Sequence, residues 1–196
     1  MPQDLMNGQS NNAGKSISLN LDALGDAVND QPSFASNDEK PFLKEEVEAE
    51  IIGTDFRLMS QLSSNQSDPS KKYFNTVFAI ETRFTCTIVN ENGETETKEF
   101  VSRDNYSGLR YFPKFDENGN VMRMADGTPA LDRFWNGDTS AFGRLLAIVQ
   151  SYDSTVRSYA DFFAFFNRPG LKCKILTEEV NYQGQKKAKQ FIQSFI

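Results

Sequence analysis

Aromatic and basic residues alternate in several short segments of this 196-residue chain. Lys71-Lys72-Tyr73-Phe74 is one such segment, and the run from Arg110 to Phe115 (RYFPKF) is another. Flat rings stack on unpaired bases, while Lys and Arg neutralise phosphates without distinguishing one base from another. The mixture therefore predicts a surface that binds single-stranded nucleic acid.

Two sets of residues are the candidates for that surface. The rings that we expect to stack on bases are Tyr73, Tyr106, Tyr111, Phe112 and Trp135. The basic residues that we expect to contact phosphates are Lys71, Lys72, Arg83, Arg103, Arg110, Lys114, Lys186 and Lys187. An alternative stays open, because the same rings can pack in a core and the same basic side chains can simply face water on loops.

The chain contains no histidine, and this excludes several kinds of catalytic site. It rules out His-based acid–base catalysis, Ser-His-Asp and Cys-His nucleophiles, and His-ligated metals. A metal-dependent nuclease built on carboxylates remains an alternative, with these candidate acids: Asp104, Asp116, Glu117, Asp126, Asp132 and Asp138. Most of them lie in predicted turns or at a helix cap, where Asp has a structural role. We therefore expect a protein that is not an enzyme and holds no metal or cofactor.

The net charge of −6 is unevenly distributed along the chain. Residues 1–50 contain ten acids and three bases, whereas residues 51–196 contain seventeen acids and eighteen bases. Since phosphate binding depends on local charge, the acidic N-terminal part does not argue against nucleic acid. We find neither a signal-peptide pattern nor a long apolar run, so we expect a cytoplasmic protein without membrane contact. Cys86 and Cys173 are expected to be free thiols.

The composition divides the chain near residue 44. Residues 1–44 are rich in Asn, Asp, Ser, Gln and Gly, which predicts a disordered acidic arm. Within it, Ser18–Val28 has loosely helical spacing, which predicts a transient helix or, alternatively, a segment that folds on a partner. Residues 45–196 are predicted to form one nucleic-acid-binding domain.

Strand and helix patterns follow in a regular order within that domain. The predicted strands are Val47–Met59, Tyr73–Val89, Thr95–Arg103, Leu171–Val180 and Lys187–Phe195. A polar loop is expected over 61–72, an irregular insertion over 104–138, and helices over Ser140–Tyr152 and Tyr159–Phe166. In the second strand, alternation places Phe74, Thr76, Phe78 and Ile80 on one face and Tyr73, Asn75, Glu81 and Arg83 on the other.

Five strands with helices between the third and the fourth are the element order of an OB-fold. We therefore expect a mainly β domain, an OB-like barrel, with another β-rich α+β domain as the alternative. OB-folds bind oligonucleotides across their second and third strands, where several of the candidate rings and bases lie.

Residues from about Glu48 onward resemble phage-encoded single-stranded DNA-binding proteins. The similar segments are Tyr73–Phe78 (YFNTVF), Ala141–Leu146 (AFGRLL), Gly170–Lys174 (GLKCK) and Tyr182-Gln183-Gly184. The resemblance implies a sequence-tolerant binder, of OB-fold type, that protects single-stranded DNA during phage replication or recombination in the host cytoplasm.

The chain departs from these proteins at its ends. Many of them recruit replication partners through an acidic C-terminal tail, but Phe191–Ile196 contains no acid and the acidic arm is N-terminal. We hypothesise that this arm occupies the basic groove or binds a replication protein. The remaining alternative is a structural protein, such as a virion or assembly component, whose exposed rings contact another subunit. Self-association into an oligomer is compatible with either function.

Overall fold

A computed structural model describes residues 41–65, 68–89, 92–182 and 184–196. Most of the predicted N-terminal arm, including the segment Ser18–Val28, lies outside the described residues. The described part is mainly β, with one antiparallel sheet and two helices. In it, no helix has the length and apolar character needed to span a membrane.

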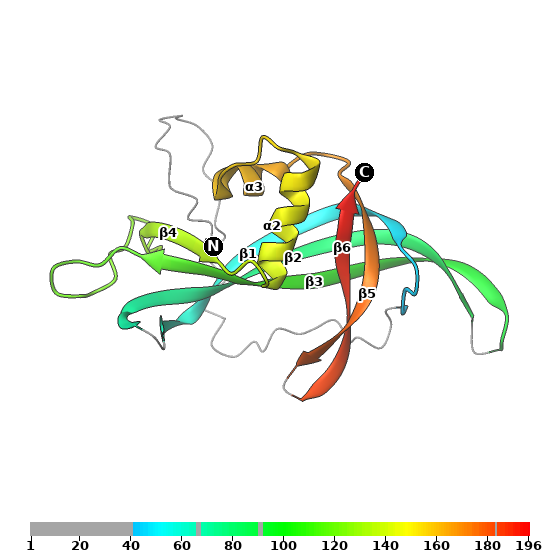
Figure 1. The fold of residues 1–196 in the computed structure, drawn as a ribbon, viewed down its shortest axis with the longest axis horizontal. Helices are drawn as coiled ribbons and strands as arrows, with labels where there is room; N and C mark the ends of the chain where they lie inside the picture. The colour runs from blue at the N-terminus through cyan, green and yellow to red at the C-terminus, as the bar shows by residue number, and fades with distance from the viewer. Residues whose placement is uncertain (1–40, 66–67, 90–91, 183) are drawn as a thin grey trace.

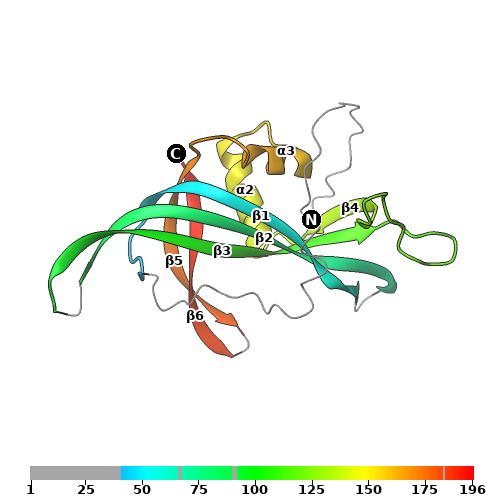
Figure 2. The same ribbon diagram turned by 180° about the vertical axis from the view of Figure 1, so that it is seen from behind.

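Six strands form the sheet, in the spatial order β4-β3-β2-β1-β5-β6. Their bounds are β1 Val47–Asn65, β2 Asp68–Val89, β3 Thr95–Pro113, β4 Leu131–Asn136, β5 Lys172–Tyr182 and β6 Gln185–Phe195. Strands β1, β2 and β3 run the length of the molecule, and the β5–β6 hairpin crosses them steeply (Figures 1 and 2). Helices α2 and α3 lie on one side of the long strands.

The two faces of the long strands differ in chemistry, as the alternation in β2 predicts. Phe74, Thr76, Phe78 and Ile80 are buried on one face, which we call the inner face, and Phe78 and Ile80 belong to the same core cluster as residues of the helices. Asn75 and Arg83 are exposed on the opposite, outer face. Because successive strand residues point to opposite sides, the sequence separates a core face from a solvated one.

Both helices lie where the sequence predicts them. Helix α2 (Ala141–Tyr152) begins after Ser140, whose hydroxyl accepts the N–H of Gly143 at 3.0 Å. Helix α3 (Tyr159–Phe165) begins after Ser158 in a capping box with Asp161. A Cβ on Gly143 would meet the carbonyl oxygen of Gly137 at 2.2 Å, so only glycine lets α2 pack this closely.

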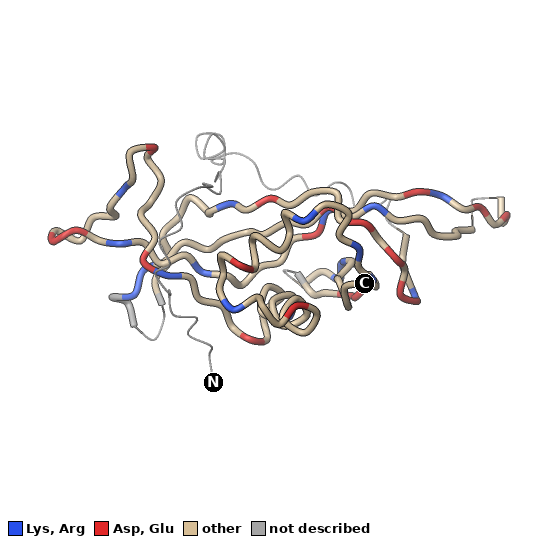
Figure 3. Tube along the Cα trace, turned by 90° about the horizontal axis from the view of Figure 1, so that it is seen from above, with Lys and Arg blue, Asp and Glu red and all other residues tan. Residues whose placement is uncertain are grey.

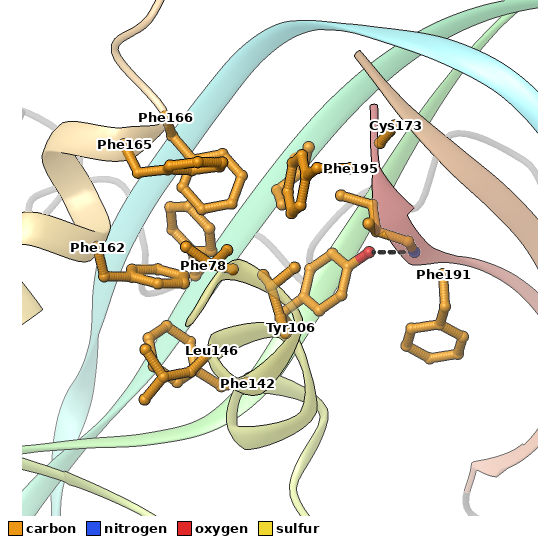
Figure 4. Packing of buried hydrophobic residues seen from close by; sticks show 14 of the residues in the cluster. Phe78, Tyr106, Phe142, Leu146, Phe162, Phe165, Phe166, Cys173, Phe191 and Phe195 are labelled. Atoms are coloured by element: carbon orange, nitrogen blue, oxygen red, sulfur yellow. Dashed lines mark hydrogen bonds between the residues drawn. The ribbon is translucent and has the colours of Figure 1, made fainter. Parts of the chain in front are cut away.

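Aromatic rings make up much of the core between the helices and the sheet. Figure 4 shows Phe78 of β2 facing rings from α2, α3 and the residue after α3. The ring centroids of Phe78 and Phe166 are 5.2 Å apart, and those of Phe165 and Phe195 are 4.9 Å apart. These edge-to-face contacts fix the helical segment against both parts of the sheet.

Two predicted irregular segments are strand instead. The predicted loop over 61–72 is wrong because β1 and β2 extend into it as a long hairpin. The predicted insertion over 104–138 begins too early, since β3 continues to Pro113. The register shifts near Gly108, which has a φ of 109°, and this bulge interrupts the alternation that marks a strand.

The sheet is open, and its strands β3 and β6 are joined by side chains. The backbone N–H of Ile192 donates to the hydroxyl of Tyr106 at 3.0 Å (dashed in Figure 4). The N–H of Gln190 donates to Oδ1 of Asp104 at 3.3 Å. We call this joint the β3–β6 seam. The predicted mainly β fold is confirmed, while the closed barrel stays a prediction.

The folded domain begins a few residues earlier than the sequence predicts. Leu43, which we expected in the arm, is buried, and its N–H donates to Oγ1 of Thr177 at 2.9 Å. The amide of Gln190 donates to the carbonyl of Pro41 at 3.1 Å. Residues 41–44 therefore pack on β5 and β6. The two cysteines are free, as predicted: Cys173 is buried and Cys86 is half-buried.

Candidate nucleic-acid interface

Five of the ring and arginine side chains gather on the outer face where β2, β3 and β4 meet. Arg110 lies opposite Trp135, and Phe112 lies opposite Arg133, in the register of β3 with β4. Tyr73 completes the group from β2, and its ring centroid lies 5.5 Å from that of Phe112. We call these five residues the ring–arginine cluster.

Rings and guanidinium groups alternate across the cluster. The Cζ atom of Arg110 is 4.5 Å from the ring centroid of Tyr73 and 4.8 Å from that of Trp135. The Cζ atom of Arg133 is 5.0 Å from the ring centroid of Phe112. Rings and guanidinium planes are both surfaces on which bases stack, so the cluster offers several stacking positions side by side.

The two arginines of the cluster differ in charge environment from the other arginines that contact rings. Within the described ranges, neither Arg110 nor Arg133 lies in an ion pair. Elsewhere, arginines that contact rings are paired: Arg144 contacts Glu178 at 3.3 Å and Arg168 contacts Asp153 at 2.6 Å. The positive charge of the cluster is therefore left for an anion to neutralise.

The cluster is partly open to solvent. Phe112, Trp135 and Arg110 are half-buried, and Arg133 is exposed. Tyr73 is only 8% exposed because Phe112 and Arg110 cover its ring. A base can therefore reach Phe112 and Trp135 directly, whereas the Tyr73 ring supports the cluster from below.

Three predicted lysines flank the cluster along the chain. Lys71 and Lys72 come just before Tyr73 and are exposed, as is Lys114 just after β3. Lys72 lies opposite Ser64 of β1, beside the Ser63–Tyr73 pair. Alternation places Lys71 on the same face of β2 as Tyr73, whereas Lys72 points to the opposite face.

Two of the predicted stacking rings are in the core, which corrects that part of the prediction. Tyr106 and Tyr111 are 3% and 2% exposed, and both point to the inner face. The Tyr111 hydroxyl donates to the carbonyl of Pro129 at 2.5 Å, and burial raises the pKa of Tyr111 to about 12. We expected them in or beside a loop, but both lie in β3, where alternation and the bulge turn them inward.

The other predicted phosphate contacts lie away from the cluster. Arg103 and Arg83 are on the outer face but contact acids: Arg103 pairs with Asp55 and Glu81, and Arg83 lies 4.0 Å from Glu99. Lys186 and Lys187 are at the start of β6, where Lys186 pairs with Glu179 at 3.2 Å. Figure 3 shows acidic residues interspersed with basic ones along most of the chain.

One member of the cluster, Arg133, is not among the predicted phosphate contacts. Arg133 stands two residues before Trp135, and the period of two that puts both on one face marks β4. The turn signals around β4 predict an irregular insertion, and this prediction hides the strand period of Arg133 and Trp135. Asn75 is a further exposed neighbour, opposite Arg110 in the register and bonded to Ser63 at 3.1 Å.

The acids considered for a metal site serve local structure. Hydrogen bonds from Asn120 and from the backbone of Asn118 lower the pKa of Asp116, and Thr128 does the same for Asp126. Asp104 is buried and accepts hydrogen bonds from Ser102 and Gln190. No three metal-ligating side chains come together in the described part of the chain.

Comparisons with known proteins return no relative from which a function could be transferred. No protein-family model, curated protein or solved structure matches the chain. The likeness to phage single-stranded DNA-binding proteins therefore stays a prediction, and the geometry of the ring–arginine cluster has to support the function by itself.

Proposed function

We propose that this chain is a non-enzymatic, sequence-tolerant single-stranded DNA-binding protein and that the ring–arginine cluster is its binding surface. One observation carries the proposal: Arg110 and Arg133 lie among three rings on a sheet face and have no acidic partner in the described residues. Stacking on such rings contributes about 1–3 kcal/mol per base and tolerates any base.

The members of the cluster would have different roles in DNA binding. Bases stack on Phe112, on Trp135 and on the exposed side of the guanidinium groups, while phosphates follow Arg133 and the flanking lysines. Base edges have no dedicated hydrogen-bonding partners in this arrangement apart from Asn75, so sequence preference is weak. A protein with this role protects single strands during replication or recombination.

The arrangement of strands supports an OB-like fold. Strands β1, β2 and β3 form a meander, two helices follow, and β5 pairs with β1 before the closing strand β6. The OB-fold is a partly open barrel that binds oligonucleotides on the face of its second and third strands. The cluster lies on β2, β3 and the added strand β4, which is the corresponding region.

A fluorescence titration tests the proposal directly. Trp135 is the single tryptophan and belongs to the cluster, so its emission should change on addition of dT20 and much less on addition of duplex DNA. The affinity should fall with salt, with a log–log slope of about −0.7 for each phosphate contacted.

Paired variants identify the surface. The double variant Arg110→Gln/Arg133→Gln should bind labelled dT20 at least about tenfold more weakly, since two phosphate contacts are lost. The matched control, Arg144→Gln/Arg168→Gln, removes the same charge from ring-contacting arginines that already have acidic partners, and should bind like the wild type. Equal weakening by both variants would show that overall charge, and not the cluster, is responsible.

A second candidate function rests on exposed apolar side chains at the other end of β2 and β3. Val89 and Val101 are 70% and 56% exposed, and Phe42 nearby is 54% exposed. Apolar residues on a protruding hairpin suit contact with another protein, as in an assembly component. Absence of any DNA binding, together with concentration-dependent sedimentation of the pure protein, would favour this candidate.

A further inference from the structure

A second group of charged side chains occupies the centre of the same outer face. Arg103 donates to Asp55 at 2.6 Å through Nη2 and to Glu81 at 2.8 Å through Nη1. Arg57 donates through Nε to the same oxygen of Asp55, also at 2.6 Å. We call Asp55, Arg57, Glu81 and Arg103 the central ion-pair network. Its two acids balance its two arginines.

The backbone leaves room for this network. Gly53 stands opposite Glu81 at a register shift in β1. A Cβ at Gly53 would come within 3.2 Å of the Glu81 carboxylate, so the glycine lets that carboxylate lie over β1 beside Arg103. The backbone of the sheet therefore accommodates the network, which binds the Arg103 side chain to acids of β1 and β2.

The network lies in line with the ring–arginine cluster. Arg57 is opposite Val77, which pairs with Ser107, three residues from Arg110 along β3. Arg103 is seven residues from Arg110, or about 20 Å along the strand. The arginines of the two groups therefore follow one another on the outer face: Arg57 and Arg103 are neutralised by acids, while Arg110 and Arg133 have no ion pair in the described residues.

We propose that Asp55 and Glu81 set the length of the DNA-binding site. By holding Arg57 and Arg103 in ion pairs, they confine a bound strand to the cluster end of the face. This inference rests on the proposed function and adds a role for two acids that touch no DNA. Removal of their charges leaves the positive charges of Arg57 and Arg103 without these two carboxylates and extends the positively charged track along the outer face.

The test compares oligonucleotides of two lengths. The variant Asp55→Asn/Glu81→Gln should bind dT20 about tenfold more tightly at low salt, with a log–log salt slope steeper by about 1.4, as two added phosphate contacts require. Binding of dT2, which is too short to reach from the cluster to Arg103, should stay at the wild-type level. The occluded length on poly(dT) should increase.

A control with the same change in charge separates a local effect from a general one. Asp153→Asn/Glu178→Gln frees Arg168 and Arg144, which are not part of the central network, and should leave dT20 binding unchanged. An equal gain in this control, or no gain in Asp55→Asn/Glu81→Gln, would overturn the inference while leaving the proposed function standing. Failure of the wild type to bind any single strand would overturn both.

A second variant keeps the inference testable if the first one folds poorly. The variant Asp55→Asn/Arg57→Gln/Glu81→Gln/Arg103→Gln, which removes both acids and both arginines and leaves no unpaired charge, should bind dT20 like the wild type, because neutralised arginines contribute little to phosphate binding. A loss of about tenfold, similar to that of the cluster variant, would show that these arginines already contact DNA and would contradict the inference. Circular dichroism and thermal unfolding check that each variant is folded.

Discussion

The hydroxyl of Tyr106 is a buried hydrogen-bonding group at the β3–β6 seam. It accepts the backbone N–H of Ile192 at 3.0 Å, and the ring packs edge-to-face on Phe191 with centroids 5.8 Å apart. Burial raises the pKa of Tyr106 well above its ordinary value, so the phenol is neutral at physiological pH. Its role is structural.

We predict that Tyr106→Phe lowers the free energy of unfolding by about 1–3 kcal/mol, because the Ile192 N–H is left buried without an acceptor. Urea unfolding followed by circular dichroism measures the change. Tyr152→Phe is the matched control, since the exposed Tyr152 hydroxyl contacts the carbonyl of Ile196 at 3.1 Å and its loss should cost little. A Tyr106→Phe protein as stable as the wild type would show that water replaces the hydroxyl.

At the scale of single residues, the sequence predicted which types of side chain form the candidate interface better than which face of the sheet each residue occupies. Arg110, Phe112 and Trp135 lie together as a binding surface requires, and Tyr73 supports them. Tyr106 and Tyr111 also have rings and basic residues beside them in the sequence, but their side chains point inward. Ring and charge content carry no information about the face of a strand, and the bulge at Gly108 broke the alternation that would have supplied it.

Among the elements, helix α2 ends at a carboxylate with several partners. Asp153 follows the last helical residue, and its carboxylate accepts hydrogen bonds from the hydroxyl and N–H of Thr155 and from Arg168. These contacts, with the Thr155 hydroxyl first, lower the pKa of Asp153 to about 2. The charged form of Asp153 therefore holds the α2–α3 connection together.

The sign of the pH dependence follows from this lowered pKa. Asp153 contributes stability fully above pH 4, near its unfolded pKa, and loses that contribution as the pH falls to about 2. We predict that Asp153→Asn makes stability fall less steeply than in the wild type over this window, as measured by thermal unfolding at each pH. Ser154→Ala, at the exposed neighbouring position, should keep the wild-type slope. Parallel curves for the wild type and Asp153→Asn would contradict the assignment.

The sequence predicted elements well where one physical signal was sufficient. The cap signal at Ser140 predicts the start of α2, and the apolar alternation in β2 gives its inner face. The prediction failed where polar segments are strand, as at the β1–β2 hairpin. There, pairing with a neighbouring strand outweighs a low local preference for β structure, and a single sequence does not show that neighbour.

At the scale of the whole molecule, charge is divided between the N-terminal residues and the folded domain. Residues 1–40 contain six acids and two bases, so they contribute −4 to the net charge of −6. The carbonyl of Pro41 accepts a hydrogen bond from the Gln190 side chain, and a deletion should therefore stop at residue 40.

We predict that deletion of residues 1–40 tightens binding of dT20 a few-fold at low salt, because a net negative charge that repels DNA is removed. The difference should shrink as salt screens the charges, and titrations at several ionic strengths measure it. A full-length variant with the six acids of this segment changed to amides separates charge from bulk. Identical affinities with and without residues 1–40 would dispose of any role of this segment in DNA binding.

The β3–β6 seam has one further consequence, for how this architecture tolerates change. Strands that pair through backbone hydrogen bonds tolerate most substitutions, since every residue except proline contributes an N–H and a carbonyl. Here the junction between the two ends of the sheet is made by one carboxylate and one phenol, Asp104 and Tyr106. Two substitutions are therefore enough to open the β3–β6 seam, while the backbone ladder between β1 and β5 still holds the terminal hairpin to the long strands. Two side chains thus decide whether β6 stays docked against β3.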